Sequence, residues 1–392
     1  MGLSVVMVER TAQPGGIASH VTQWLSRSFH VKGGFPAEFL AEITRRGICR
    51  FPNYRNAELV PYFDTLIDEA GVTPLYLAYV VAPVMEQDRL IGAIVESKSG
   101  RHAIMAKVVI DSTGDGDVAA LAGAEFRIGR DSDGACQPIS LSHLIMNYGG
   151  SPMEAQQFDR IIEEACRRAA NGYVLPYSHN NRFKHWPGSR QASLNGRPHV
   201  MGYDALNAEQ LSRALVELRK QAVEFYELLK HHTQEFAGIE FGPLSTLPGV
   251  RESRRIRCDR MITYADVVEG RRCDDGLFLV TQNIDIHRRV PGEPSIHLEQ
   301  VQPYHVPYGA LLPRGLENIL VIGRCIGGDH EAMASYRTIA DCMAMGEAAA
   351  IASYMAIESQ CSPRRIDCRQ LVHSMHDRGY GDRKSEGEEK HL

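Results

Sequence analysis

The stretch SVVMV, residues 4–8, decides the fold class, because this short β-branched run ends in Glu9-Arg10 and is followed by Gly15-Gly16. That order is typical of the second strand of a dinucleotide-binding βαβ unit, whose terminal carboxylate accepts hydrogen bonds from the hydroxyls of an adenosine ribose. A first strand, a Gly-x-Gly-x-x-Gly turn and a first helix should precede it, and they need roughly 30 residues. Met1 leaves no room for them. We therefore expect the first βα unit to be absent, with Met1 either a mis-assigned start or the edge of a truncated gene.

Composition is that of an ordinary globular protein and excludes several classes of partner. The chain has 392 residues, which favours two domains, and 44% of them are hydrophobic. A net charge of −5 gives no electrostatic reason to expect nucleic acid or an anionic membrane as partner. The nine cysteines lack C-x-x-C spacing, so neither a metal site nor an iron–sulfur cluster is predicted. Unclustered thiols favour a reduced, cytoplasmic protein.

The most apolar long segment, residues 339–357, is expected to be a buried helix and not a membrane span. It contains Asp341 and Glu347, each of which is costly at a bilayer centre. No signal-peptide pattern opens the chain. We therefore predict no association with a membrane.

The apolar strands at the two ends of the chain are expected to share one parallel sheet. These strands are residues 5–8, 108–110 and 319–322. A strand meander is predicted over residues 75–83, 90–96 and 101–105. Helices are predicted at residues 36–46, 56–70, 151–170, 207–232 and 339–357, with a further capping box at residues 263–266.

A discontinuous architecture follows from this order of elements. Residues 1–126 and 302–360 would form an α/β nucleotide-binding domain, and residues 127–301 an inserted α+β domain against which a substrate binds. Residues 361–392 would supply a C-terminal helix and a charged, disordered tail.

The turn at residues 111–117, DSTGDGD, is the first candidate site, since it ends a strand and enters a helix at the edge of the sheet where nucleotides bind. Gly114-x-Gly116-x-x-Ala119 matches a relaxed dinucleotide fingerprint, but Asp115 and Asp117 would place two carboxylates beside a pyrophosphate. The alternative is a tight strand–helix turn with Asp capping.

The stretch GRCIGGDHEAMASYRTIADCMAM, residues 323–345, is the second candidate. It brings a helix N-terminus near the same edge, where its free N–H groups and its dipole favour an anionic ligand. An Ala-rich core helix is the alternative. Cys325 and Cys342 are interpreted as small buried residues.

An arginine-rich region between residues 249 and 289 is the third candidate. Arg251 and Arg254 would share one face of a helix or turn and form a bidentate clamp for a carboxylate or phosphate. His287 and His330 are candidate general acids or bases. Solvated arginines and structural histidines are the competing interpretation.

Together, VVMVER…GG, KVVIDSTGDGDVA, GVRESRRI, DIH and NILVIGRCIGGDHEAMASYRTIADCMAMGEAAA resemble one family over residues 3–375. The chain resembles bacterial FAD-dependent oxidoreductases of the glutathione-reductase-like superfamily, in a branch distantly related to the flavoproteins of fumarate reductase and of heterodisulfide reductase. The resemblance implies a Rossmann-like three-layer FAD-binding domain, here with the first βα unit absent. The cluster cysteines of the heterodisulfide reductase relatives have no counterpart in this sequence.

The resemblance also implies non-covalent FAD and assigns residues to it. The assigned residues are Glu9 and Arg10 at the adenosine ribose, Gly15, Gly16 and Ala18 along the pyrophosphate and ribityl path, Val81 at adenine, Thr113, Gly114 and Asp115 in a turn that closes on FAD, Gly323 and Arg324 along the ribityl chain, and Arg337, Thr338 and Ile339 at the flavin pyrimidine edge. There the helix dipole would stabilise a reduced, anionic flavin.

The leading hypothesis is a flavin oxidoreductase that moves hydride or electrons between FAD and a small, anionic substrate. Arg251, Arg254, His287 and His330 are then the candidates for binding and proton transfer, and a homo-oligomer or an electron-transfer partner is compatible with it. The alternative is a cofactor-deficient, N-terminally truncated paralogue that survives as a fragment or binding subunit. A nicotinamide dehydrogenase that uses Gly114 and Gly116 is a third option.

Overall fold

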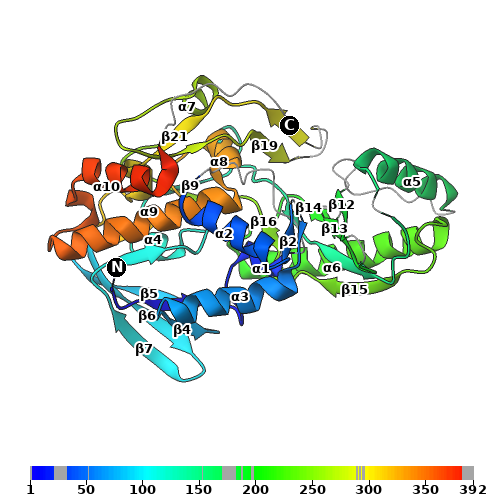
Figure 1. Cartoon of the computed structure of the whole chain (residues 1–392), viewed down its shortest axis with the longest axis horizontal. Helices are drawn as coiled ribbons and strands as arrows, with labels where there is room; N and C mark the ends of the chain where they lie inside the picture. Colours follow the sequence, from blue (N-terminus) through cyan, green and yellow to red (C-terminus); the bar gives the residue numbers. More distant parts are fainter. Residues whose placement is uncertain are drawn as a thin grey trace.

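The computed structural model describes residues 2–21, 33–51, 53–151, 153–169, 182–186, 189–195, 198–287, 290, 293 and 296–381. The long helix α9 (Ile339–Glu358) and the meander of β5 (Tyr79–Glu86), β6 (Arg89–Ser97) and β7 (Gly100–Met105) lie toward one end of the molecule (Figure 1). The helices α5 (Ala155–Arg168) and α6 (Ala208–His232) form the other end. No described helix is long and apolar enough to cross a membrane.

Two pairs of parallel strands carry the nucleotide-binding part. β1 (Val6–Glu9) pairs with β4 (Thr73–Tyr76), and β8 (Val109–Asp111) pairs with β22 (Ile319–Val321). The predicted parallel pairing is confirmed for β8 and β22. The expectation that β1 shares their sheet is wrong, because among the described strands β1 pairs with β4 alone and the two pairs form separate sheets.

The meander is confirmed as an antiparallel sheet of β5 (Tyr79–Glu86), β6 (Arg89–Ser97) and β7 (Gly100–Met105). The single strand expected over residues 75–83 is divided into β4 and β5. The break is at Leu77, which has a positive φ of 54° that a strand does not accommodate.

Most predicted helices are confirmed with small shifts of their ends. α2 (Gly34–Arg45), α3 (Asn56–Glu69) and α9 lie where the periodicity places them. Asn207 caps α6 by accepting a hydrogen bond from the N–H of Gln210 at 3.0 Å, and α7 (Tyr264–Glu269) begins with the predicted capping box. The start of α5 is an exception, because it begins after Glu154 and not after Ser151, and residue 152 lies outside the described part.

The other elements are short. They are α1 (Ile17–His20), β2 (Cys49–Arg50), β3 (Asn53–Tyr54), α4 (Asp117–Leu121), β9 (Phe126–Ile128), β10 (Ile139–Ser140), β11 (His143–Met146), β12 (Arg182–His185), β13 (Ala192–Asn195), β14 (His199–Val200), β15 (Glu240–Leu244), β16 (Gly249–Val250), β17 (Arg254–Ile256), β18 (Gly276–Val280), β19 (Ile284–His287), β20 (Ile296–Glu299), β21 (Tyr304–Pro307), α8 (His330–Tyr336), α10 (Cys368–Met375) and the turns Tyr308–Leu311, Pro363–Arg365 and His376–Tyr380.

The hydrophobic cores divide the chain into a large lobe and a small lobe. The small-lobe clusters draw on residues 139–239, with Leu244 and Val250 packed against them. The large-lobe core combines residues 90–124 and 304–380 with residues 256–286. The limits 127–301 stay a prediction, but this packing favours an insertion that ends near residue 250, because residues 256–286 are buried with the large lobe.

A buried ion pair ties the two lobes together. The Glu252 carboxylate is fully buried and accepts hydrogen bonds from Arg255, from His330 Nδ1 at 2.8 Å and from the N–H of Gln137 at 3.1 Å. Arg255, only 1% exposed, donates its second Nη to the carbonyl of Gly129 at 2.6 Å. Gln137 leads directly into β10 of the small lobe, so this cluster joins β17, α8 and the connection between the lobes.

Helix α9 begins with a buried acid. Its buried face is a stripe of small residues, Ala340, Ala344, Ala348, Ala352 and Ala356, which lets the helix approach its neighbours closely. Asp341 is 2% exposed, and its carboxyl accepts hydrogen bonds from the hydroxyl and the N–H of Thr338. Burial raises the pKa of Asp341 to about 8 in spite of these bonds.

Glu252→Gln should cost about 3–5 kcal/mol of unfolding free energy, because it leaves the buried guanidinium of Arg255 without its counter-charge. Urea unfolding followed by circular dichroism measures this loss. Glu209→Gln is the matched control, since it breaks the exposed pair of Glu209 with Arg213 and should cost less than about 0.5 kcal/mol. Equal losses in the two variants would contradict the central role given to Glu252.

Asp341→Asn should change how stability depends on pH. The pKa of Asp341 is raised from 3.8 in the unfolded chain to about 8 in the folded one, so the wild type should lose stability as the pH rises from 4 through 8. The variant should lack this loss and exceed the wild type in melting temperature above pH 8. Thermal unfolding from pH 5 to pH 9 tests this, and parallel curves for the two proteins would contradict it.

Candidate functional site

The carboxyl ends of β8 and β22 lie side by side, and a buried aspartate shapes the first of them. Asp111 Oδ1 accepts hydrogen bonds from the N–H (3.0 Å) and hydroxyl (2.7 Å) of Thr113, and its Oδ2 accepts one from the N–H of Ala119 at 2.9 Å. The Thr113 hydroxyl in turn accepts from the N–H of Asp117 at 2.9 Å. Burial raises the pKa of Asp111 above its usual range. This network fixes the turn that leads from β8 into α4.

The turn after β22 contacts the turn after β8. Arg324 forms an ion pair with Asp115, and the hydroxyl of Ser253 donates to the same carboxylate oxygen. Arg254 forms an ion pair with Asp117 at 2.7 Å. Both acidic side chains are therefore neutralised by arginines, which removes the charge objection to a nucleotide at this edge.

Glycine is required at two positions of this edge. Gly114 has a φ of +75°, and a Cβ there would lie 2.7 Å from Arg324 Nη1. Gly323 has a φ of +90°, but a Cβ there would meet nothing nearer than the Cys342 sulfur at 3.9 Å. Gly323 therefore faces open space into which a ligand can approach the backbone closely.

At the end of β1, the carboxylate of Glu9 is only half engaged. Its Oε1 accepts hydrogen bonds from the N–H and the hydroxyl of Thr11, both at 2.7 Å, while Oε2 accepts none from the described residues. Arg10 is exposed beside it. Gly15 and Gly16 lead into α1, where the carbonyl of Gly15 accepts a hydrogen bond from the N–H of Ala18 at 3.1 Å.

Val81 lies at a β-bulge of β5, where the pairing with β6 steps from Val80 to Ala82. A bulged residue is out of the ladder, so its backbone groups can meet a ligand, and its side chain is 39% exposed. The open backbone of Gly323, the half-engaged Glu9 and the bulge at Val81 all fit an adenine dinucleotide. The residues present thus fit FAD. Thr338 and Ile339 begin α9, as expected.

A second constellation, here called the junction cluster, lies where the two lobes meet. Its members are Gln137, Ser140, His199, Arg251, Asp285, His287 and Arg337. Gln137 Oε1 accepts hydrogen bonds from the N–H of His287 at 3.1 Å and from Arg337 Nη2 at 3.0 Å. Arg337 also donates to the carbonyls of Arg251 (2.8 Å) and Asp285 (2.7 Å), so it binds three separate segments together.

Two histidines face each other in the junction cluster. The rings of His199, from β14, and His287, from β19, lie nearly parallel with centroids 5.9 Å apart. His287 Nε2 lies 3.3 Å from Asp285 Oδ1. Burial, together with the charges of Arg251 and Arg337, lowers the pKa of His287 to about 4, so its ring is neutral near pH 7.

The predicted arginine clamp is wrong. Residues 251–256 are extended and not helical, so Arg251 and Arg254 do not share a face. Arg251 donates to the hydroxyl of Ser140 at 2.8 Å, while Arg254 turns to Asp117. Arg288 and Arg289 lie outside the described residues.

His330 belongs to the buried Glu252 cluster, and the competing interpretation of a structural histidine fits its position. Cys325 is buried, as interpreted, and burial raises the pKa of its thiol well above its usual range. Cys342 is only partly buried, although desolvation raises the pKa of its thiol to about 12. The sequence missed Gln137 and His199. Neither residue lies in a motif that marks it in the sequence.

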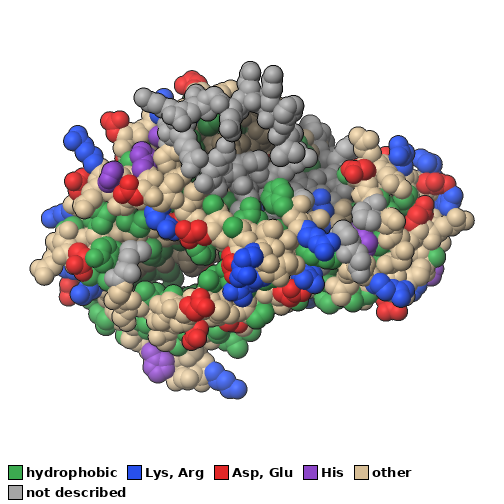
Figure 2. Space-filling model, viewed as in Figure 1, with side chains coloured by type: hydrophobic (Ala, Val, Ile, Leu, Met, Phe, Trp, Pro, Cys, Tyr) green, Lys and Arg blue, Asp and Glu red, His purple; other side chains and the backbone are tan. Residues whose placement is uncertain are grey.

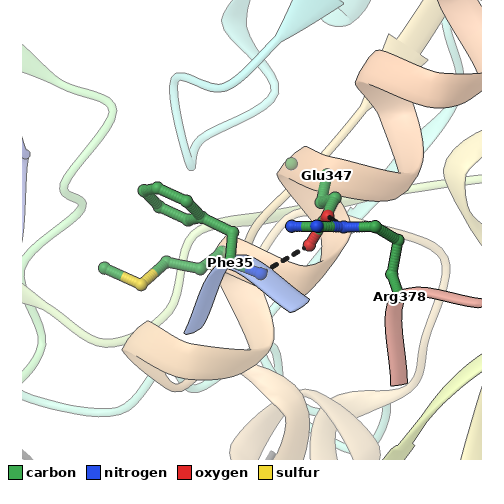
Figure 3. Close-up of a pocket in the computed structure, with 5 residues that line it drawn as sticks. Phe35, Glu347 and Arg378 are labelled. Atoms are coloured by element: carbon green, nitrogen blue, oxygen red, sulfur yellow. Dashed lines mark hydrogen bonds and ion pairs between the residues drawn. The ribbon is translucent and has the colours of Figure 1, made fainter. Parts of the chain in front are cut away.

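A cavity of about 350 Å³ lies further along α9. Figure 3 shows Glu347 and Arg378 turned toward each other in its wall, with the N–H of Phe35 donating to Glu347 at 2.7 Å. The hydroxyl of Tyr380 donates to the same carboxylate at 2.6 Å. Because Glu347 is fully engaged in joining α2, α9 and the last turn, this cavity offers little chemistry beyond apolar contact.

On the face shown in Figure 2, the surface is hollowed between α9 and the meander, with hydrophobic side chains on the walls. Val6 of β1 and Ile110 of β8 are 43% and 37% exposed.

Among the described residues, no group of three or more His, Cys, Asp or Glu side chains could hold a metal ion.

A comparison with solved structures finds similar proteins of low sequence identity. Among solved structures, the flavin-dependent brominase Bmp2 has 14% identity and a TM-score of 0.44 over 96% of this chain and 77% of its own. A geranylgeranyl bacteriochlorophyll reductase-like protein from Thermoplasma acidophilum has 13% identity and a TM-score of 0.41, covering 95% and 82%. The p-nitrophenol 4-monooxygenase PnpA from Pseudomonas putida DLL-E4 has 10% identity and a TM-score of 0.43, covering 95% and 78%.

No curated protein sequence matches the chain. The family model described as FAD dependent oxidoreductase matches residues 1–375, nearly the whole length. The chain therefore belongs to the FAD-dependent oxidoreductase family, a family of enzymes whose cofactor is FAD.

Proposed function

We propose that FAD binds along the edge formed by Glu9, Val81, Thr113 and Gly323, and that a small anionic substrate binds at the junction cluster. The flavin, when bound, supplies the two-electron redox chemistry. The observation that carries this proposal is the position of Arg337, which belongs to the junction cluster and directly precedes Thr338, the N-cap of α9. The start of α9 and the junction cluster are therefore neighbours in space.

Within this proposal, the side chains of the junction cluster have separate roles in substrate binding and proton transfer. Arg251 and Arg337 supply positive charge for the substrate, and neutral His287 accepts a proton, with Asp285 holding its ring. Arg254 shapes the cofactor turn through Asp117. His330 acts through Glu252, as a residue that positions Gln137.

We also propose a fold of the glutathione-reductase-like type in which β1–β4 and β8–β22 stay two separate parallel pairs, with no described strand between them. This arrangement also supports the alternative function, a cofactor-deficient paralogue. Val5 and Val6 are 44% and 43% exposed, and unpaired backbone groups along β1 would cost about 1–3 kcal/mol each once buried. Binding of FAD separates the two functions.

The wild-type chain should quench added FAD fluorescence in a saturable titration, and Gly323→Val should weaken this binding by about tenfold or more, since its side chain would fill the space into which Gly323 opens. Gly47→Val is the matched control. Gly47 also has a positive φ (+73°) with no atom within 4 Å of a Cβ, but it lies at the end of α2. The Gly47→Val protein should lose about as much stability as Gly323→Val and keep the wild-type affinity for FAD.

Wild-type protein that is folded and yet binds no FAD would support the cofactor-deficient paralogue. Equal affinity in Gly323→Val and wild type would show that FAD does not pass this edge.

A further inference from the structure

The side-chain amide of Gln137, in the junction cluster, has an unsatisfied hydrogen-bond donor. Gln137 is 2% exposed, and its buried Nε2 has no hydrogen-bond partner among the residues that the structure describes. Its Oε1 is held by the N–H of His287 and by Arg337, which fixes the orientation of the amide. A buried donor left unpaired costs about 1–3 kcal/mol, so a group that accepts from it is expected.

The neighbouring Arg337 is a cation whose contacts are all uncharged. Its hydrogen bonds go to the carbonyls of Arg251 and Asp285 and to the amide oxygen of Gln137. Within the described part of the chain, no carboxylate oxygen lies within 4.0 Å of its guanidinium. Burial lowers its pKa, and the negative charges of Asp285 and Glu252 oppose this shift only in part.

The nearby carboxylates form their direct contacts with other residues. Glu252 contacts Arg255 and His330, and Asp285 faces the ring of His287. A buried N–H donor beside a cation that forms no direct ion pair with a described residue favours an oxygen acceptor, and an anionic oxygen gives the strongest bonds to both groups.

We propose that Gln137 Nε2 and Arg337 together form the receptor for a carboxylate group of the substrate. This inference rests on the proposed function and specifies it, since it names the substrate class and adds a binding residue, Gln137. The flavin's own carbonyl oxygens could offer the same acceptor chemistry, so the test separates these two sources.

The test uses the full chain without FAD and follows its melting temperature as formate, acetate or malonate is added at constant ionic strength. At least one of these carboxylates should stabilise the wild type saturably. Gln137→Glu should weaken this binding by about tenfold or more, because it replaces the donor with a like charge. The variant should fold, since its carboxylate still accepts from His287 and gives Arg337 a counter-charge.

Gln210→Glu is the matched control, because Gln210 Oε1 also accepts a backbone N–H, that of Asp204 at 2.9 Å, away from the junction cluster. It should respond to carboxylates like the wild type. FAD affinity, measured separately, should be equal in all three proteins, and loss of FAD binding in the wild type would count against the proposed function and not against the anion site.

Three results would overturn the inference. The first is an equal carboxylate response in Gln137→Glu and wild type. The second is no saturable response in the wild type, which would mean that Nε2 holds only a structural water. The third is weaker FAD binding in Gln137→Glu without any carboxylate response, which would assign the donor to the flavin.

Discussion

The buried ion pair of Glu252 and Arg255 is the interaction on which the rest of the structure depends. Both side chains are almost wholly removed from water, so each is stable in place only because the other neutralises it. Glu252 also accepts hydrogen bonds from the ring of His330 and from the N–H of Gln137, while Arg255 donates one to the carbonyl of Gly129. One carboxylate thus sets the positions of β17, α8 and the connection to the small lobe.

The residues around this pair contact both the turns expected to hold FAD and the junction cluster. Ser253 and Arg254 reach the acidic turn after β8, and the N–H of Ile256 donates to the carbonyl of Cys325 in the turn after β22 at 2.8 Å. On the other side, Gln137 reaches Arg337 and His287. The short segment 252–256 therefore connects the edge expected to hold FAD to the junction cluster through direct hydrogen bonds.

Much of the local structure could be predicted from the sequence, because caps, breaks and periodicity are local signals. Asn207 at the start of α6 and Thr263 at the start of α7 are examples. The pairing of β1 could not be predicted in this way, since the choice of partner strand is set by distant residues. The strand is divided into β4 and β5 at Leu77, whose positive φ cannot be predicted from the sequence pattern around it.

The candidate site was predicted in part for the same reason. The turns at Thr113 and Gly323 carry glycines and acids that mark them, and the structure brings them together. The arginines of GVRESRRI suggested an exposed or ligand-binding run, yet Arg255 is the largest fully buried side chain. Gln137 carries no sequence signal at all, because its role depends on Arg337 and His287, which are distant in the chain.

Hydrogen–deuterium exchange with and without FAD tests the central claim most directly, since it reports on each segment separately. The account predicts slower exchange on FAD addition at residues 9–20, 111–119 and 323–341, and a smaller change at residues 137–140, which are coupled through Glu252. Protection confined to other segments, or no protection while FAD is bound, would contradict the account.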